Sequence, residues 1–393
     1  MQPKKKPSQN IAEMYGIGLF AFVLFLSTLM AIPVLPGLSS QLGASDTQIP
    51  IVLSAALATV VIVQFFTGIL ADRYSRRTLI LVGALLGSIS SFLCVIATHW
   101  TQLLTLRILG GIADAIAMPS LLAITSTLGK DQPGKFFGIL RGSQGMSFVL
   151  GPAIGSLLSL ISLRTPFLAD GILSLVAFLA AFRFIRDKER APAPHSLNAF
   201  NGIKQLLRSR SIYLYLLLGI SAMFSFGVLQ SFVPTKAQII GLSPWQIGAI
   251  MAVGALVHSI VSFSVGSLSD KYGRRLFAIV AQPVIVISGI ALFFCNNFHL
   301  ILIVYGIFCI GETIAFLLSF VYASESFEQE YVGTSMGIFD SLIDLSLFVA
   351  PLISISVFNI TARILYPFII AVVPASICLI TSFSLPGRKT ENN

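Results

Sequence analysis

Long apolar runs alternate with short polar segments along this chain of 393 residues. Each run has roughly 20 residues, the length that an α-helix needs to cross the hydrocarbon core of a bilayer. Twelve such runs are present, six on each side of a more polar central segment. Helices satisfy every backbone polar group inside lipid. The pattern therefore predicts an all-α membrane protein with twelve transmembrane helices.

A repeated polar segment indicates that the chain consists of two similar halves. Residues 68–77 read GILADRYSRR, and residues 266–275, which begin 198 positions later, read GSLSDKYGRR. The same shift places Glu312 opposite Asp114. Such self-similarity is typical of a duplicated unit. We predict two pseudo-symmetric six-helix bundles with a cytoplasmic linker between them, at residues 1–185, 186–210 (the linker) and 211–393.

Composition and charge fit this prediction. The chain is 55% hydrophobic and 10% charged, with a mean hydropathy of +0.90, whereas about a quarter of the residues in soluble domains are charged. If the N-terminus is cytoplasmic, most basic residues fall inside, and the exceptions are Arg164, Lys236 and Arg363. The positive-inside rule then predicts cytoplasmic termini in a multi-pass protein of the plasma (inner) membrane. The net charge of +9 therefore does not indicate nucleic-acid binding.

The sequence lacks the motifs of several other function classes. The four cysteines lie singly in apolar runs, so neither disulfides nor a metal site is expected. There is no glycine-rich phosphate loop and no HExxH motif, and the four histidines are scattered. We therefore expect no enzyme activity and no cofactor. The energy source would be an ion gradient, of which a proton gradient is the one expected here, or the substrate's own gradient.

The two arginine-rich segments resemble the signature between helices two and three of the major facilitator superfamily, G-x-L-A-D-R-x-G-R-R. The first copy departs from it at Ser75, where the family usually has glycine, whereas the second copy keeps Gly273. The resemblance covers nearly the whole chain. It implies two six-helix bundles built from three-helix inverted repeats, with the substrate site at the midplane between them.

The same resemblance implies an inner gate formed by these two segments. Asp72 and Asp270 would face the N-termini of helices from the opposite half, an attraction of under about 1 to 2 kcal/mol that must break when the transporter opens inward. The alternative is that these segments only anchor the topology. The expected gate residues are Gly68, Asp72, Arg73, Arg76, Arg77, Gly266, Asp270, Arg274 and Arg275.

Two further motifs indicate the branch of the family. Arg107 begins a sequence similar to the fourth-helix motif R-x-x-x-G of proton-coupled branches. Gly151, Pro152 and Gly155 look like the fifth-helix motif G-P-x-x-G of the twelve-helix drug:proton antiporters, although serines replace two of its usual glycines. The resemblance implies that Gly151 and Pro152 bend this helix and seal the outer side against leakage.

Four acids and two arginines lie in the middle or inner portions of the apolar runs. Each would cost about 2.5 to 3.5 kcal/mol if it faced lipid, so we expect all six to face a central cavity or one another. A buried carboxylate is pushed toward its neutral form by desolvation and toward its charged form by a nearby arginine, which suits proton coupling. The six are Asp114, Glu312, Asp340, Asp344, Arg107 and Arg141.

We expect a proton from the outer side to compete with the substrate for one of the three aspartates. Glu312 would help to bind the substrate, and Arg107 would tune Asp114 or relay protons. The alternative is that both arginines form fixed ion pairs that hold helices together. Asp170 lies near the outer end of its run and is expected to be solvated or to cap a helix.

Together these features predict a proton-coupled secondary active transporter, an efflux antiporter that exports small amphipathic or cationic compounds by alternating access. One alternative is a proton symporter or uniporter for a specific metabolite such as a sugar or organic acid. A second is a membrane sensor that transports nothing. The expected partners are a small-molecule substrate, protons and the lipid bilayer, with no nucleic acid, and the protein is expected to be a monomer.

Overall fold

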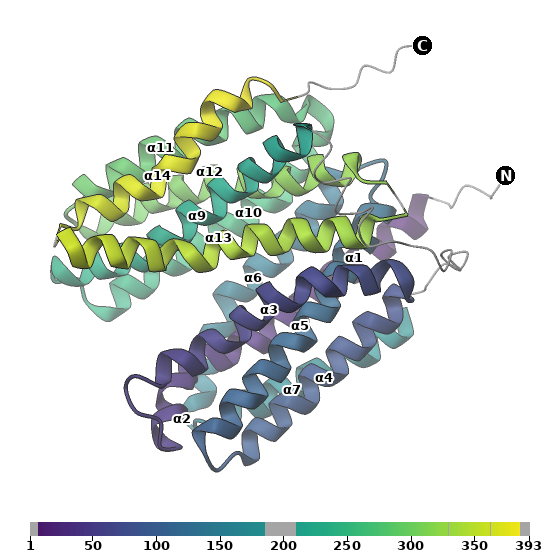
Figure 1. The fold of residues 1–393 in the computed structure, drawn as a ribbon, viewed down its shortest axis with the longest axis vertical. Coiled ribbons are helices and arrows are strands. Elements are labelled where there is room, and N and C mark those ends of the chain that lie inside the picture. The colour runs from purple at the N-terminus through teal and green to yellow at the C-terminus, as the bar shows by residue number, and fades with distance from the viewer. Residues whose placement is uncertain (1–6, 185–209, 329, 362, 386–393) are drawn as a thin grey trace. The chain divides into compact units, whose positions relative to one another are not determined.

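In the computed structural model the chain is described over residues 7–184, 210–328, 330–361 and 363–385, and within these ranges it forms helices and turns but no strand. Twelve of the described helices have at least 18 residues (Figure 1). The first six are α1 (Pro7–Ala31), α3 (Ile49–Arg73), α4 (Arg76–Ile96), α5 (Trp100–Leu128), α6 (Pro133–Ser159) and α7 (Thr165–Phe184). The other six are α9 (Arg210–Ile239), α10 (Pro244–Tyr272), α11 (Arg274–Phe294), α12 (Phe298–Ser326), α13 (Val332–Thr361) and α14 (Leu365–Ser382).

Eleven of these helices are long and apolar enough to cross a membrane. The twelfth, α6, is 27 residues long but carries Lys135, Arg141 and Gln144 among several glycines, which lower its hydropathy. The first span does not end at its prolines. It continues through a 3₁₀ turn (Ile32–Val34) into α2 (Leu35–Gln41), because proline fits the first turn of a helix. The chain is therefore a multi-pass membrane protein.

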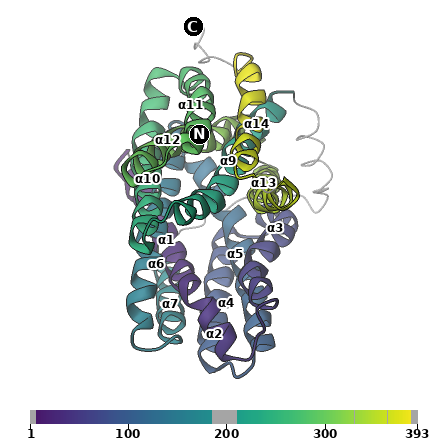
Figure 2. The same ribbon diagram turned by 90° about the vertical axis from the view of Figure 1, so that its left-hand side faces the viewer.

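Packing groups the chain into two compact units. The first contains Met1–Leu128, Ser143–Lys204 and Phe327–Ser341. In it, α5 packs against α3 and α4, and α7 packs against α4 and α1 (Figures 1 and 2). Of these pairs only α4 and α5 follow each other along the chain.

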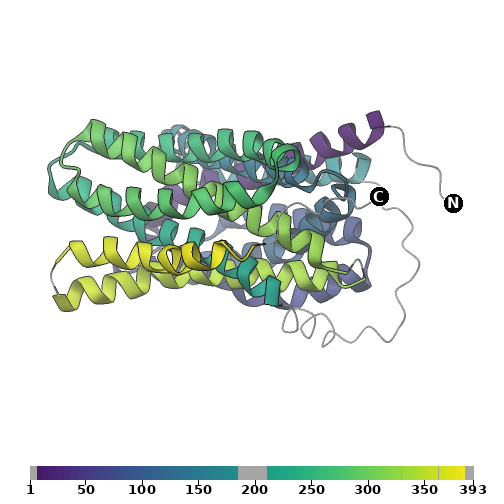
Figure 3. The ribbon, with the colours of Figure 1, turned by 90° about the horizontal axis from the view of Figure 1, so that it is seen from above.

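The second unit contains Gly129–Gly142, Gln205–Ser326 and Leu342–Asn393. Here α12 packs against α9, α10 and α11, and α14 packs against α9 and α11. Helices α10, α11 and α12, drawn in green in Figure 3, run antiparallel to their neighbours along the chain.

This grouping differs in two places from the six-helix halves predicted from the repeat. The first third of α6 belongs to the second unit, and the first third of α13 belongs to the first unit. The reason is local packing, since these segments lie against α10 and α3 through glycine contacts described below. The predicted linker at 186–210 lies outside the described residues except for Arg210, where α9 begins. The predicted bundle boundaries stay a prediction.

Candidate functional site

In the first unit, Asp72 binds the N-terminus of α13. It lies in the last turn of α3 and is 3% exposed. Its Oδ1 accepts a hydrogen bond from the backbone N–H of Gly333 at 2.7 Å, and its Oδ2 accepts one from the N–H of Thr334 at 2.6 Å. The first N–H groups of a helix have no partner within the helix and carry the positive end of its dipole. The carboxylate therefore satisfies two of these groups and offsets the dipole.

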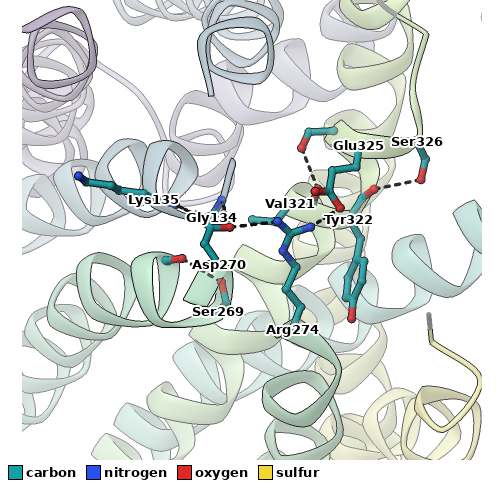
Figure 4. Close-up of polar contacts among 11 residues, drawn as sticks. Gly134, Lys135, Ser269, Asp270, Arg274, Val321, Tyr322, Glu325 and Ser326 are labelled. Atoms are coloured by element: carbon teal, nitrogen blue, oxygen red, sulfur yellow. Dashed lines mark hydrogen bonds and ion pairs between the residues drawn. The ribbon is translucent and has the colours of Figure 1, made fainter. Parts of the chain in front are cut away.

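The second unit contains the equivalent contact. The Oδ1 and Oδ2 atoms of Asp270, near the end of α10, accept hydrogen bonds from the backbone N–H groups of Gly134 at 3.0 Å and Lys135 at 2.8 Å, at the start of α6. Figure 4 shows Arg274 between this carboxylate and Glu325. Its Nη2 lies 3.0 Å from Asp270 Oδ1, and its Nη1 bonds to the Glu325 carboxylate. Asp270 thus joins a helix N-terminus to a three-residue charge network.

Glycines allow the helices to meet closely at these contacts. A Cβ atom on Gly68 would lie 2.8 Å from the carbonyl oxygen of Gly333, and one on Gly266 would clash with the carbonyl oxygen of Gly134. Both distances are shorter than real Cβ contacts, so no larger residue fits without a shift of the backbone. Sequence reasoning had singled out only the two motif glycines. The signal for their partners was the repeat itself, because Gly134 and Gly138 on α6 stand 199 residues before Gly333 and Gly337 on α13. The α6 pair lies against Gly266, and the α13 pair lies against Gly68.

The arginines of the two motifs bind elsewhere. Arg77 donates to the carbonyl oxygen of Phe182 at the end of α7 at 2.5 Å, and Arg275 donates to that of Phe383 after α14 at 2.6 Å. A cation at a helix C-terminus satisfies free carbonyls and offsets the negative end of the dipole. Arg76 binds Ala123 and Thr127 on α5, and Arg73 is exposed. Of the nine predicted gate residues, the two aspartates and the two glycines form the helix contacts described above.

Arg107 and Asp114 lie two turns apart on α5 in the first unit. Arg107 is 9% exposed, and its Nε is buried with no hydrogen-bond partner in the described part of the chain. Its charge lies within electrostatic range of both Asp114 and Asp170. Among the described residues no hydrogen bond to Asp114 is found, and its side chain is half-buried in the middle of the helix.

Asp170 corrects an expectation from the sequence, because it neither faces solvent nor caps a helix. It is 4% exposed, in the second turn of α7. Ser91 on α4 donates to its Oδ2 at 2.6 Å, and Ser174 donates to its Oδ1 at 3.2 Å. Ser174 in turn lies 3.0 Å from the hydroxyl of Ser27 on α1. The carboxylate therefore belongs to a buried polar network that joins three helices.

In the second unit, Glu312 on α12 is completely buried and contacts a histidine that sequence reasoning had set aside. Glu312 Oε2 lies 3.2 Å from Nδ1 of His258, in the middle of α10. The hydroxyl of Thr313 lies 3.0 Å from the same Nδ1 and 3.2 Å from Oε2. The other oxygen, Oε1, has no hydrogen-bond partner among the described residues. The available signal was that His258 alone among the four histidines falls in the middle of an apolar run.

Arg141 on α6 is 6% exposed and lies over aromatic rings of α12. Its guanidinium carbon is 4.6 Å from the ring centre of Phe316 and 4.2 Å from that of Phe320. Phe316 also contacts the ring of His258, at 6.2 Å between centres. Cation–π contacts are strongest where water is excluded. A continuous set of side chains thus runs from Arg141 through Phe316 to His258 and Glu312.

The two acids of α13 fall in different units. Asp340 is 2% exposed and accepts a 2.6 Å hydrogen bond from Gln64 Nε2 on α3. The adjacent Ser341 donates to the carbonyl oxygen of Val61 at 2.6 Å. Asp344 is half-buried and belongs to the second unit. The structure therefore ties Asp340 to the same α3–α13 contact as Asp72.

The helix-five motif lies against α1 in the first unit. A Cβ atom on Gly151 would lie 2.6 Å from Leu29 Cβ, and one on Gly155 would clash with the carbonyl oxygen of Met30. Pro152 lies between them inside α6. Small residues permit this close helix packing in a membrane.

The described residues contain no group of three or more His, Cys, Asp or Glu side chains able to hold a metal ion.

Comparison with known proteins agrees with this architecture. The family model of the Major Facilitator Superfamily matches residues 17–351. The chain is 25% identical over 349 residues to the quinolone resistance protein NorA of Staphylococcus aureus (strain MSSA476), which covers 86% of this chain and 88% of that protein. It is 27% identical over 370 residues to multidrug resistance protein 1 of Bacillus subtilis (strain 168), which covers 91% and 92%.

Among solved structures, the human organic anion transporter MFSD10 (TETRAN) matches with a TM-score of 0.83. The match covers 96% of this chain and 100% of that one at 16% sequence identity, so it concerns the fold alone. The predicted all-α class and the twelve-helix fold of this superfamily are confirmed.

Proposed function

The chain belongs to the Major Facilitator Superfamily, and from this premise we propose that it exports small amphipathic or cationic compounds in exchange for protons. Members of this family carry small molecules across membranes, so the chain is a transporter and not an enzyme. Direction, coupling ion and substrate class belong to the proposal. Each of these rests on a separate observation.

The burial of Glu312 supports the proposed coupling of substrate export to proton movement. Glu312 is 0% exposed in the middle of α12, and one of its oxygens has no partner among the described residues. A charged carboxylate in such a place is costly unless a counter-charge or a proton accompanies it. Binding either a proton or a cation relieves this cost. A carrier that must hold one or the other as it turns over exchanges the two.

Export is supported by the relatives and by α6. The two relatives above are named for resistance to quinolones and to multiple drugs. Gly151 and Gly155 bring α6 into close contact with α1, which fits the sealing role that the helix-five motif implies. No cofactor is needed in this proposal, since the proton gradient across the plasma (inner) membrane supplies the energy.

Alternating access in this proposal uses the two aspartate contacts. With both termini cytoplasmic, Asp72 and Asp270 lie at the cytoplasmic ends of α3 and α10. Inward opening separates α13 from α3 and α6 from α10, which breaks four charge-assisted hydrogen bonds. The interaction of one charge with a helix terminus contributes about 0.3 to 2 kcal/mol. The contacts are therefore strong enough to hold a closed state and weak enough to open during each cycle.

The test uses the purified protein in liposomes that contain a trapped pH dye, with lipophilic cations and metabolites offered in turn. We expect a lipophilic cation to drive protons in the opposite direction, and Glu312→Gln, like Asp114→Asn or Asp344→Asn, to abolish the exchange. Asp46→Asn, in an exposed loop, is the matched control. Movement of only a sugar or organic acid together with protons would instead identify a symporter. If no compound moves, the transport proposal fails and a sensor becomes the better explanation.

A further inference from the structure

The contact between His258 and Glu312 joins two helices of one unit at their midpoints. His258 lies in the middle of α10 and Glu312 in the middle of α12, and these helices pack together. The Glu312 side chain is 0% exposed, whereas the His258 side chain is 18% exposed. Thr313 lies within hydrogen-bond distance of both partners. Of the two titratable side chains in this cluster, only the histidine is therefore partly exposed.

Few other charged groups face this pair. On α12, Tyr305 and Cys309 lie within electrostatic range of Glu312, and both are uncharged at neutral pH. On α6, Arg141 faces the pair across the ring of Phe316. The remaining ionisable side chains of the elements packed on α10 and α12 lie toward helix ends or on α13, which packs on α9: Lys135, Tyr213, Tyr215, Lys236, Asp270, Lys271, Tyr272, Arg274, Arg275, His299, Tyr322, Glu325 and Asp344.

The net charge of the pair depends on a single proton. With the histidine protonated and the glutamate ionised, the pair is a neutral hydrogen-bonded couple. Loss of the histidine proton leaves a net charge of −1 in a buried place, which is costly without compensation. A bound monovalent cation restores the positive charge that was lost with the proton. The balance is one proton released for each monovalent cation bound, and total charge is conserved.

We propose that His258 and Glu312 form one exchange site that holds either a proton, carried on the histidine ring, or a monovalent organic cation, with Thr313 keeping the two partners aligned. This inference rests on the proposed transport function and adds a residue and a stoichiometry to it. Glu312 supplies the negative charge in both states, and its second oxygen, Oε1, is buried without a hydrogen-bond partner among the described residues.

The test measures binding of tetraphenylphosphonium to the purified full-length protein between pH 5.5 and 8.5. This probe is permanently charged, so only the protein titrates. We expect affinity to rise with pH by up to about tenfold per unit on the acid side, as displacement of one proton requires. Glu312→Gln should weaken binding at least tenfold at pH 8. His258→Gln and His258→Asn should move or remove the acid-side dependence while binding at pH 8 persists. His299→Gln, at an exposed histidine, is the matched control.

A second readout follows the histidine directly. With four histidines in the chain, ¹⁵N ring signals can be assigned by their loss in single variants. At pH 6, saturating tetraphenylphosphonium should convert the His258 signal from the protonated to the neutral form. An unchanged signal, or an unchanged pH dependence of binding in folded His258→Gln, overturns the exchange site. If that happens while the liposome exchange of the wild type persists, the proposed transport function stands without this site. If the wild type exchanges nothing in liposomes, the transport function itself fails.

Discussion

Asp72 on α3 and Asp270 on α10 stand 198 residues apart and bind the first backbone amides of two repeat-equivalent helices, α13 and α6. Each contact lies beside a close approach of glycines from the same two helices. In the second copy Arg274 bonds to both Asp270 and Glu325. At the position equivalent to Glu325 the first copy has Thr127, which accepts a 2.8 Å hydrogen bond from Arg76. The second copy therefore has a carboxylate where the first has a hydroxyl.

Removing the charge of Asp72 should loosen the α3–α13 contact. Asp72→Asn keeps the size of the side chain but loses the charge-assisted hydrogen bonds to Gly333 and Thr334. We expect the contact to weaken by about 1 to 2 kcal/mol, roughly a 5- to 30-fold shift toward the separated state. The measurement is the rate at which a water-soluble maleimide labels Val61→Cys, a position on α3 that lies under α13.

The natural cysteines do not interfere with this assay, since all four are buried. Asp46→Asn, in an exposed loop, serves as the control and should leave the labelling rate unchanged. Equal rates in Asp72→Asn and the wild type would show that the carboxylate does not hold the two helices together.

Replacing a contact glycine should act through shape alone. In Gly266→Ala the new methyl group would clash with the carbonyl oxygen of Gly134, so α10 and α6 must move apart. We expect a loss of about 1 to 3 kcal/mol in the free energy of unfolding, typical of overpacking. Thermal unfolding in detergent measures it.

The same helix supplies a matched control for this substitution. A Cβ atom on Gly248 meets nothing within 4 Å. Gly248→Ala should therefore be neutral or slightly stabilising, because alanine favours the helix. Similar melting temperatures for the two variants would contradict the close approach of α10 to α6.

The repeat and the family signature were enough to predict most of this helical architecture from the sequence. Twelve apolar runs specify the helices, because each run must be helical to satisfy its backbone in lipid. The two motif aspartates were expected to face helix N-termini, and the structure places them there. Their role as a gate stays a prediction.

The sequence pattern did not predict which side chains of different helices contact each other. His258 and Glu312 are 54 residues apart, and nothing in either run specifies that α10 turns this face to α12. The prediction for Asp170 was wrong because the residue lies near the end of an apolar run, where side chains usually reach solvent. Helix α7 begins at Thr165, and Ser91 of α4 and Ser27 of α1 contact the turn that follows and bury it. Tertiary packing, rather than local pattern, decides such cases.

The Asp170 network gives a prediction of its own. Asp170→Asn keeps an oxygen that can accept from Ser91 or Ser174, so we expect a loss of at most about 1 kcal/mol in the free energy of unfolding. Asp170→Leu leaves the buried hydroxyls without their acceptor and should cost about 2 to 4 kcal/mol. Denaturation in detergent separates the two. If the leucine variant is as stable as the asparagine variant, the network does not stabilise the first unit.

Lys236 is one of the three basic residues predicted on the outer side of the membrane, and the structure gives it a role in capping a helix. Lys236 on α9 is 6% exposed, and its Nζ donates to the carbonyl oxygens of Leu292, at 2.8 Å, and Phe293, in the last turn of α11. A cation at this position satisfies carbonyls that have no partner within the helix. In the first unit, Arg164 binds the carbonyl oxygens of Val95 and Ala97 at the end of α4. Two of the three basic residues predicted outside therefore cap helices.

Removing the amine of Lys236 should destabilise the end of α11. Lys236→Met keeps an apolar stem of similar length but loses the amine, which donates to the two carbonyls and lies over the rings of Phe293 and Phe368, so we expect a loss of about 1 to 3 kcal/mol in the free energy of unfolding. Lys236→Arg should recover part of it, because the guanidinium can still reach the carbonyls. Lys130→Met, at an exposed turn, should change stability by less than about 0.5 kcal/mol. If Lys236→Met unfolds like Lys130→Met, the lysine does not act as the cap of α11, and its burial needs another cause.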